Sequence, residues 1–260
     1  MGVSPRIAAP RLGRALGPGD VRIHYRAVDA SDAAAEASAR RVLSSDERER
    51  AARFVFARDR AAYVAAHALL RNALSAYEDV SPDAWTFAQN GRDKPALAAR
   101  HAGAGLTFNL AHTEGLVACA IGRGLDVGID VERLREDVPA LELASRFFSP
   151  AEVAGLAAGA GSARARRFIE LWTLKESYVK AIGQGLSHPF DGFGFALSGS
   201  SGLRFEAPAG VDAGHWQFVL YAPSARHRLA LAVRSGESEG VRITLVGGDT
   251  ATARLLRASS

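Results

Sequence analysis

Three carboxylates share one face of the stretch GLDVGIDVER, residues 124–133. Apolar residues alternate with Asp126, Asp130 and Glu132, and this alternation predicts a β-strand because successive side chains point to opposite faces. Asp130 and Glu132 are two residues apart, so both carboxylates can reach a common point above the sheet and bind Mg²⁺ there. An exposed strand face without a ligand is the alternative. Gly128 leaves room for a ligand or for another stretch of backbone.

The segment FIELWTLKESYVKAIG, residues 168–183, predicts a helix with a lysine in its apolar face. Lys175 falls in the middle of that face. A buried ammonium without a partner is costly, which favours an anionic partner over a side chain that snorkels to solvent. Glu176 and Lys180 stand at the border of the face, on the side of Trp172. They form either a solvent-exposed i,i+4 ion pair or part of a charged site.

Two single residues add to these segments. His112 stands at the end of the predicted strand in FNLAHTEG, a place typical of binding residues and also of exposed histidines. Lys94 lies in the loop NGRDKPAL, which suits a phosphate contact and a solvent-exposed turn equally. The 32 basic residues include only three lysines, which are Lys94, Lys175 and Lys180. Lysine is therefore expected where a compact ammonium is needed.

Length and composition limit the kinds of protein that this chain can be. The 260 residues are 48% hydrophobic, enough for a sizeable core, and no apolar stretch is long enough to span a bilayer. The lone Cys119 lies in LVACAI and is expected in the core, which fits a reducing cytoplasm. The net charge is only +4, but arginines over residues 40–60 are mixed with acidic residues. That run suits a solvated helix or a docking face for an acidic partner, and no nucleic-acid-binding motif accompanies it.

Strands and helices follow the same order in both halves. Helices are predicted over 33–41, 45–56, 59–78, 139–147, 150–157 and 163–182, with strands before and after each group. This order predicts an α+β fold of two similar lobes, although no residue-level repeat links the halves. We expect a flexible tail over 1–20, lobes over 21–125 and 126–248, and a flexible tail over 249–260.

In their order and spacing these motifs resemble those of the 4′-phosphopantetheinyl transferases of the Sfp type. FNLAH is similar to the family's asparagine-x-serine-histidine strand, GIDVE to its G-[IV]-D-x-E strand, and WTLKESYVK to its W-x-x-K-E-[AS] helix. The resemblance runs from about Ser44 to about Asp191 and includes GRDKP and FSPAE. It implies two pseudo-symmetric lobes with a cleft for coenzyme A between them.

The resemblance also implies a ligand set. Asp130, Glu132 and Glu176 match the carboxylates that bind Mg²⁺, which in turn holds the diphosphate of coenzyme A. Lys180 matches a lysine that contacts this diphosphate, and His112 matches a histidine near the 3′-phosphate.

Three more positions match the coenzyme-binding side of the family. Lys94 and Arg50 match residues on the phosphate or adenine side, and Lys175 matches a lysine of the helix motif. Two positions depart from the pattern. Ala111 replaces the usual serine, so a hydroxyl contact is missing. Glu47 stands at a basic position, so the 3′-phosphate is expected to rely on Arg50 or Arg53.

The activity implied is transfer of 4′-phosphopantetheine from coenzyme A to a serine of an apo acyl or peptidyl carrier protein. Glu176 is expected to accept the proton of the serine, and Lys180 to stabilise the departing adenosine 3′,5′-bisphosphate. Carrier proteins of this kind are generally acidic, which gives the basic run a partner, and a cytoplasmic monomer is expected. Two alternatives stay open: a non-catalytic binding module for coenzyme A or carriers, and a Mg²⁺-dependent nucleotide-diphosphate hydrolase.

Overall fold

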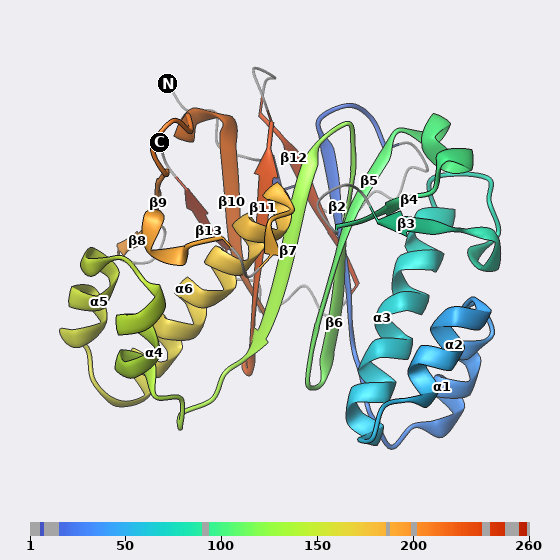
Figure 1. Ribbon diagram of the computed structural model, residues 1–260, viewed down its shortest axis with the longest axis horizontal. Helices are drawn as coiled ribbons and strands as arrows, with labels where there is room; N and C mark the ends of the chain where they lie inside the picture. The colour runs from blue at the N-terminus through green and yellow to red at the C-terminus, as the bar shows by residue number, and fades with distance from the viewer. Residues whose placement is uncertain are drawn as a thin grey trace.

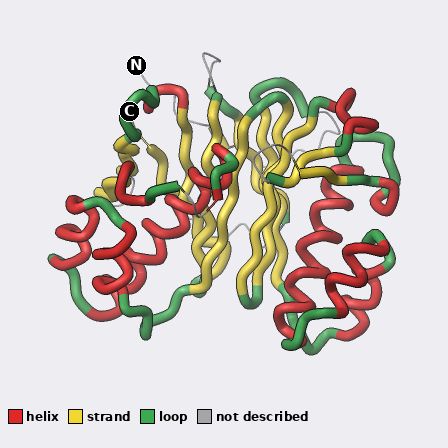
Figure 2. Tube along the Cα trace, in the orientation of Figure 1, coloured by secondary structure: helices red, strands yellow, loops and turns green. Residues whose placement is uncertain are grey.

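The computed structural model describes residues 6–7, 16–89, 94–185, 188–198, 202–235, 240–247 and 255–258. Two β-sheets lie face to face at its centre, and helices cover the outer face of each sheet (Figure 1). The layers therefore run helix, sheet, sheet, helix, as the colouring by secondary structure makes clear (Figure 2). This arrangement confirms the α+β class and the two similar lobes.

The first sheet has the strand order β1–β12–β2–β6–β5. Helix α3 (Ala57–Ser75) packs on its outer face, and α1 (Ala33–Arg40) and α2 (Ser45–Ala52) pack against α3 (Figure 1). Helix α2 ends four residues earlier than predicted because Phe54 turns inward to pack beside Leu43 and Tyr63. The elements of this lobe are β1 (Arg6–Ile7), β2 (Asp20–Ala27), α1 (Ala33–Arg40), α2 (Ser45–Ala52), α3 (Ala57–Ser75), η1 (Pro82–Ala84), the paired β3 (Phe87–Gln89) and β4 (Pro95–Leu97), η2 (Ala99–Ala104), β5 (Leu106–Thr113), β6 (Leu116–Arg123) and β12 (Arg242–Val246).

The second sheet has the strand order β7–β11–β10–β13–β9–β8, so β7 lies at its edge. Helix α6 crosses its outer face, and α4 and α5 pack against α6 (Figure 1). The elements of this lobe are β7 (Asp126–Arg133), α4 (Ala140–Phe147), α5 (Pro150–Ala157), α6 (Gly161–Ile182), η4 (Phe190–Gly192), β8 (Gly194–Ser198), β9 (Gly202–Glu206), η5 (Ala213–His215), β10 (Trp216–Ser224), β11 (His227–Arg234) and β13 (Leu255–Ala258).

Strand pairing corrects the predicted lobe boundaries at both ends of the chain. Strand β12 falls inside the predicted second lobe, yet it pairs in parallel with β2 of the first sheet. Strands β1 and β13 fall inside the predicted tails and pair with β12 and with β9 and β10. Alternation predicts a strand but carries no information about its partner. Residues 16–20 of the predicted N-terminal tail are also ordered, since Leu16 is buried and Asp20 begins β2. The remaining tail residues, 1–5, 8–15, 249–254 and 259–260, lie outside the described residues.

An apolar core joins the two sheets. Val127, Ile129 and Val131 of β7 pack there against residues of β2 and β6, and the hydroxyl groups of Tyr25 and Tyr221 lie 2.9 Å apart across it. Cys119 is fully buried, as predicted, between β6 and α3. In the described part of the chain, no helix is both long and apolar enough to cross a membrane.

Both lobes contain a capping-box glutamate that pairs with a buried cation of the long helix. Glu47 closes a capping box at the start of α2 with Ser44, and its carboxylate binds the buried Arg71 of α3 at 2.8 Å. Glu152 closes a capping box at the start of α5 with Ser149, and its carboxylate binds the buried Lys175 of α6 at 2.9 Å.

Each buried cation also binds backbone carbonyls beyond the end of its helix. Arg71 donates to Pro82 and Trp85, and Lys175 donates to Phe190 and Phe193. In each lobe, the capping-box glutamate and the buried cation thus connect the long helix to the segment that follows it. A residue-level repeat therefore exists, although the sequence pattern alone does not show it.

Candidate active site

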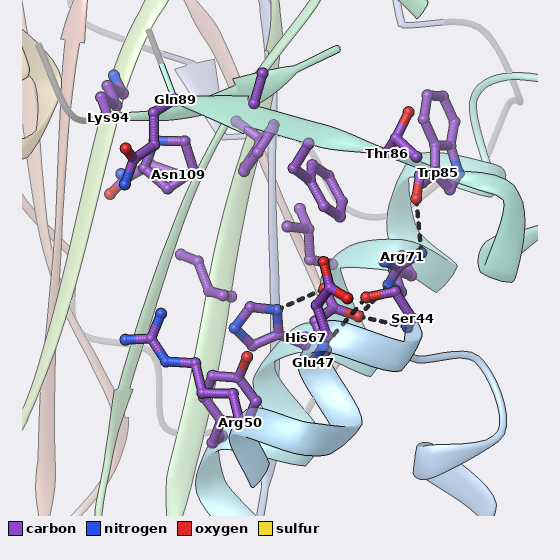
Figure 3. A pocket seen from close by; sticks show the side chains of 18 of the residues that line it. Ser44, Glu47, Arg50, His67, Arg71, Trp85, Thr86, Gln89, Lys94 and Asn109 are labelled. Atoms are coloured by element: carbon purple, nitrogen blue, oxygen red, sulfur yellow. Dashed lines mark hydrogen bonds and ion pairs between the residues drawn. The ribbon is translucent and has the colours of Figure 1, made fainter.

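A cavity of about 890 Å³ opens between the two lobes. Figure 3 shows Glu47, Arg50 and His67 on its helical side, and Gln89, Lys94 and Asn109 together at its other end. The second lobe contributes the C-terminal end of α6 and the residues after it. Lining residues include Ser44, Glu47, Arg50, Tyr63, His67, Phe87, Gln89, Lys94, Phe108, Asn109 and His112 from the first lobe, and Lys180, Gly183, Gln184 and Gly185 from the second.

The second-lobe wall depends on a close approach of helix to strand at Gly128. A Cβ at this position would lie 2.1 Å from the carbonyl oxygen of Ser177 and 2.3 Å from the amide nitrogen of Ala181. The space that the sequence leaves at Gly128 is therefore filled by the backbone of α6. Because Asp130 is two residues along the same face of β7, this contact sets its carboxylate beside Lys180 of α6.

Asp130 and Lys180 form the centre of the charged group. Oδ1 of Asp130 accepts a hydrogen bond from Nζ of Lys180 at 2.5 Å, while its Oδ2 is buried without a hydrogen-bond partner. Asp130 is 5% exposed and does not line the cavity, so Lys180 stands between the cavity and the carboxylate. Burial alone would lower the pKa of Lys180, but the charges of Asp130 and then Glu176 outweigh it and raise that pKa.

Glu132 and Glu176 are electrostatically coupled to this pair. Burial and then the Asp130 carboxylate raise the pKa of Glu132 to about 7, against the opposing charge of Lys180. The same two causes raise the pKa of Glu176. The exposed Asp126, at the start of β7, is not among the charges that shift these two groups. Asp130, Glu132, Glu176 and Lys180 therefore form one electrostatically interacting group.

Arg50 and His112 line the first-lobe wall of the cavity. The exposed Arg50 lies with its guanidinium 5.8 Å from the ring centre of Tyr63. The protein around the imidazole of His112 and the positive charge of Lys180 lower the pKa of His112. The charge of Lys180, a residue of the second lobe, thus acts on His112 of the first lobe.

Glu47 is engaged in structural contacts. Its carboxylate accepts hydrogen bonds from His67 Nδ1, Arg71 and the Ser44 amide. Burial alone would raise its pKa, but these three partners lower the pKa of Glu47 to about 2. Glu47 therefore presents no positive charge to a phosphate, and Arg50 is the cation of α2 that lines the cavity.

Two predicted coenzyme-binding residues, Arg53 and Lys175, lie away from the cavity, and a third, Lys94, lines it but is engaged by backbone carbonyls. Arg53 is exposed and does not line the cavity. Lys175 is fully buried in the second lobe, where its ammonium binds Glu152 and two carbonyls, so the anionic partner predicted for it is a carboxylate of its own lobe. Lys94 lines the cavity, but Nζ donates to the carbonyls of Val127 at 2.8 Å and Ala181 at 3.2 Å. Burial lowers the pKa of Lys94.

Sequence reasoning missed two residues of the cavity wall. Asn109 is 8% exposed, and its Oδ1 accepts a hydrogen bond from the Ile129 amide of the other lobe at 2.8 Å. His67 lies one helical turn after Tyr63 on the face of α3 that meets the cavity. The signal for Asn109 is its place in FNLAH, three residues before His112.

The carboxylates suit a hard divalent cation. Among the described residues, no three His, Cys, Asp or Glu side chains are already gathered closely enough to hold a metal ion. Yet the buried Oδ2 of Asp130 has no partner, and its charge raises the pKa of both Glu132 and Glu176. Oxygen donors with such an excess of negative charge fit Mg²⁺ better than a soft metal.

Comparisons with known proteins match both lobes. Residues 126–233 match the family model described as 4′-phosphopantetheinyl transferase superfamily, and residues 32–122 match the model described as 4′-phosphopantetheinyl transferase, N-terminal. The chain is 40% identical to the 4′-phosphopantetheinyl transferase HetI of Nostoc sp., over 56% of this chain and 61% of HetI.

Two other relatives give similar alignments. The 4′-phosphopantetheinyl transferase gsp of Aneurinibacillus migulanus is 32% identical over 58% of this chain and 60% of that protein. The 4′-phosphopantetheinyl transferase Sfp of Bacillus subtilis is 30% identical over 64% of this chain and 71% of that protein. The chain thus spans less than two thirds of the length of HetI and of gsp.

Proposed function

We propose that this chain, which belongs to the 4′-phosphopantetheinyl transferase superfamily, transfers 4′-phosphopantetheine from coenzyme A to a serine of an apo acyl or peptidyl carrier protein. The observation that carries the proposal is the buried Asp130, whose Oδ2 has no partner and whose Oδ1 binds Lys180 at the edge of the cavity. A cation-binding carboxylate beside a phosphate-binding ammonium suits a diphosphate substrate.

Asp130, Glu132 and Glu176 are the residues that would hold Mg²⁺. The metal would neutralise charge on the diphosphate of coenzyme A when bound. The unpartnered oxygen of Asp130 and the raised pKa values of Glu132 and Glu176 support this assignment, because a cation relieves the repulsion among the three groups.

The chemical step is a displacement at phosphorus. The serine oxygen of the carrier forms a bond to the phosphorus that bears the pantetheine arm, and the bond from that phosphorus to the bridging oxygen breaks. Adenosine 3′,5′-bisphosphate leaves with the bridging oxygen. Glu176 accepts the serine proton, and its raised pKa makes it a better base than an ordinary carboxylate.

Lys180 has two roles in this scheme. Its ammonium lines the cavity, where it neutralises the negative charge that develops on the departing phosphate. Its bond to Asp130 orients it from α6 toward the lobe junction. The raised pKa of Lys180 keeps it fully charged at neutral pH.

The first lobe binds the nucleotide end of coenzyme A. Arg50 and His112 line the cavity and offer donors to the 3′-phosphate, while Ala111 has no side-chain hydroxyl to add. The exposed arginines of α2 and of the segment before α3 offer an acidic carrier a basic surface next to this wall. Since both walls belong to one chain, a monomer contains the whole cavity.

One experiment separates this function from a binding module and from a nucleotide-diphosphate hydrolase. Apo carrier proteins from fatty acid, polyketide and nonribosomal peptide synthesis are incubated with the chain, coenzyme A and Mg²⁺. Intact-mass measurement then reports whether a carrier gains one phosphopantetheine group, and chromatography reports adenosine 3′,5′-bisphosphate.

We expect both the mass gain and the bisphosphate, in equal amounts. Bisphosphate without a mass gain favours the hydrolase, and bound but intact coenzyme A favours the binding module. Either result contradicts the proposed transfer. The panel also shows which classes of carrier the chain modifies.

A further inference from the structure

Strand β7 meets the first lobe along an edge that carries no partner strand. β7 ends the second sheet, β5 ends the first, and no backbone ladder among the described residues joins them. The backbone groups of Leu125, Val127 and Ile129 point toward β5, since alternate residues of a strand direct their backbone groups to the same edge.

Three side chains of the first lobe bind these groups in place of a strand. Thr107 donates to the Leu125 carbonyl at 2.6 Å and Lys94 to the Val127 carbonyl at 2.8 Å, while Asn109 accepts from the Ile129 amide at 2.8 Å. Thr107 and Asn109 are alternate residues of β5, so both face β7. The side chains therefore fix the register between the lobes.

Asn109 makes the contact nearest to the charged group. The Ile129 amide lies directly between Gly128, where α6 touches β7, and Asp130, which binds Lys180. Asn109 and Ile129 are both buried, so loss of the Asn109 oxygen leaves a buried amide without its partner, which is costly. A donor amide can bond only to the oxygen of the Asn109 side chain, which defines its orientation.

Strand β5 also carries part of the first-lobe wall of the cavity. His112 follows Asn109 on β5, and it faces the cavity together with Arg50. In the proposed function, His112 on one lobe binds the 3′-phosphate of coenzyme A, and Lys180 on the other neutralises the charge that develops on the departing phosphate. The offset between the two lobes then decides whether both contacts are made at once.

We propose that Asn109 is a positioning residue for phosphopantetheine transfer. Through the Ile129 amide it holds Asp130 and Lys180 in register with His112, without touching the substrate's reacting atoms. This inference rests on the proposed function. It predicts that loss of the Asn109 oxygen lowers kcat rather than the affinity for coenzyme A.

The test compares Asn109→Leu with Thr107→Val in the full-length chain. Each variant removes one side-chain bond at nearly constant side-chain size: the Asn109 bond is to Ile129 of β7, whereas the Thr107 bond is to Leu125, just before β7 and away from Asp130. The readouts are the thermal midpoint, kcat and KM for coenzyme A with an apo carrier, and residue-resolved amide exchange at Ile129.

We expect Asn109→Leu to lower kcat by about 10- to 100-fold with little change in KM, and to speed exchange at Ile129. Thr107→Val is expected to lower the thermal midpoint by a similar amount, but kcat and the slow amide exchange at Ile129 should stay as in the unmodified chain. Should Asn109→Leu not fold, Asn109→Ser takes its place, because its shorter hydroxyl does not reach the amide.

Two outcomes overturn the inference. Equal kcat values for the Asn109→Leu and Thr107→Val variants, with normal transfer by the unmodified chain, overturn the positioning role alone. No transfer by the unmodified chain to any carrier overturns the proposed function, and the positioning role falls with it.

Discussion

Nζ of Lys180 lies 2.5 Å from Oδ1 of Asp130, and the other oxygen of the same carboxylate is buried without a partner. Lys180 is thus the cation that faces a group of three acidic side chains on β7 and α6. Its ammonium also lines the cavity between the lobes. One residue therefore links the charged group to the place where a phosphate would lie.

Removal of this ammonium tests its role. Lys180→Met is expected to lower kcat by about 10²- to 10³-fold, the typical cost of one charge-stabilising donor. Lys180→Arg serves as the control because it keeps the positive charge but places it on a planar guanidinium. We expect its kcat to lie between those of the unmodified chain and the methionine variant. Wild-type turnover by the methionine variant, measured as bisphosphate release with an apo carrier, contradicts the assignment.

Gly128→Ala tests the contact between α6 and β7. The added Cβ meets backbone atoms of Ser177 and Ala181, so the helix must move away from the strand. We expect a loss of at least about 3 kcal/mol in the free energy of unfolding, together with a loss of transfer.

The matched control is Gly155→Ala in α5. A Cβ there meets no atom within 4 Å, so the change should stabilise the chain by about 0.5–1 kcal/mol. Denaturant unfolding measures both variants. Equal stabilities of the two variants would mean that α6 and β7 are not held in this close contact.

Glu47→Gln is expected to change how the free energy of unfolding depends on pH below neutrality. The ionised Glu47 contributes stability fully above its unfolded pKa of 4.5, and the contribution is lost as the pH falls through about 2. Gln retains the capping function, so the variant isolates the charge. The free energy of unfolding should fall by about 3 kcal/mol at pH 7. The difference between the two proteins should narrow toward pH 2, and a constant difference contradicts the role of the ion pair.

Lys175→Met separates a structural lysine from a coenzyme-binding one. The change leaves the Glu152 carboxylate buried without its cation, which costs about 3–5 kcal/mol of stability. KM for coenzyme A should stay unchanged, because Lys175 does not line the cavity. A raised KM at unchanged stability supports instead the contact with coenzyme A that the family resemblance implies.

Alternation along a strand and spacing along a helix predict which side chains share a face. This information predicts part of the candidate site correctly in its local arrangement. Asp130 and Glu132 on one strand face, and Glu176 and Lys180 on one helix border, follow from spacing alone. The occupant of the space at Gly128 does not follow, because a glycine admits either a ligand or backbone. The structure shows that the backbone of α6 lies there.

Sequence reasoning mainly failed to identify contacts between residues that lie far apart in the sequence. The pattern favours an anionic partner for Lys175 but does not identify Glu152, since both a carboxylate and a phosphate satisfy an ammonium. Likewise, alternation predicts a strand in VRITLV but not its place beside β2. The hydrogen bond that the Ile129 amide donates to Asn109 joins the two lobes, and the place of Asn109 in FNLAH does not identify Ile129 as its partner.

The most direct test of the central claim is the intact mass of an apo carrier protein after incubation with coenzyme A and Mg²⁺. The unmodified chain and its Asp130→Asn variant are compared side by side, with circular dichroism to show that both are folded. We predict that the carrier gains the mass of one phosphopantetheine group with the unmodified chain and none with the variant. An unmodified carrier in the first reaction, or equal gains in both, would contradict the account.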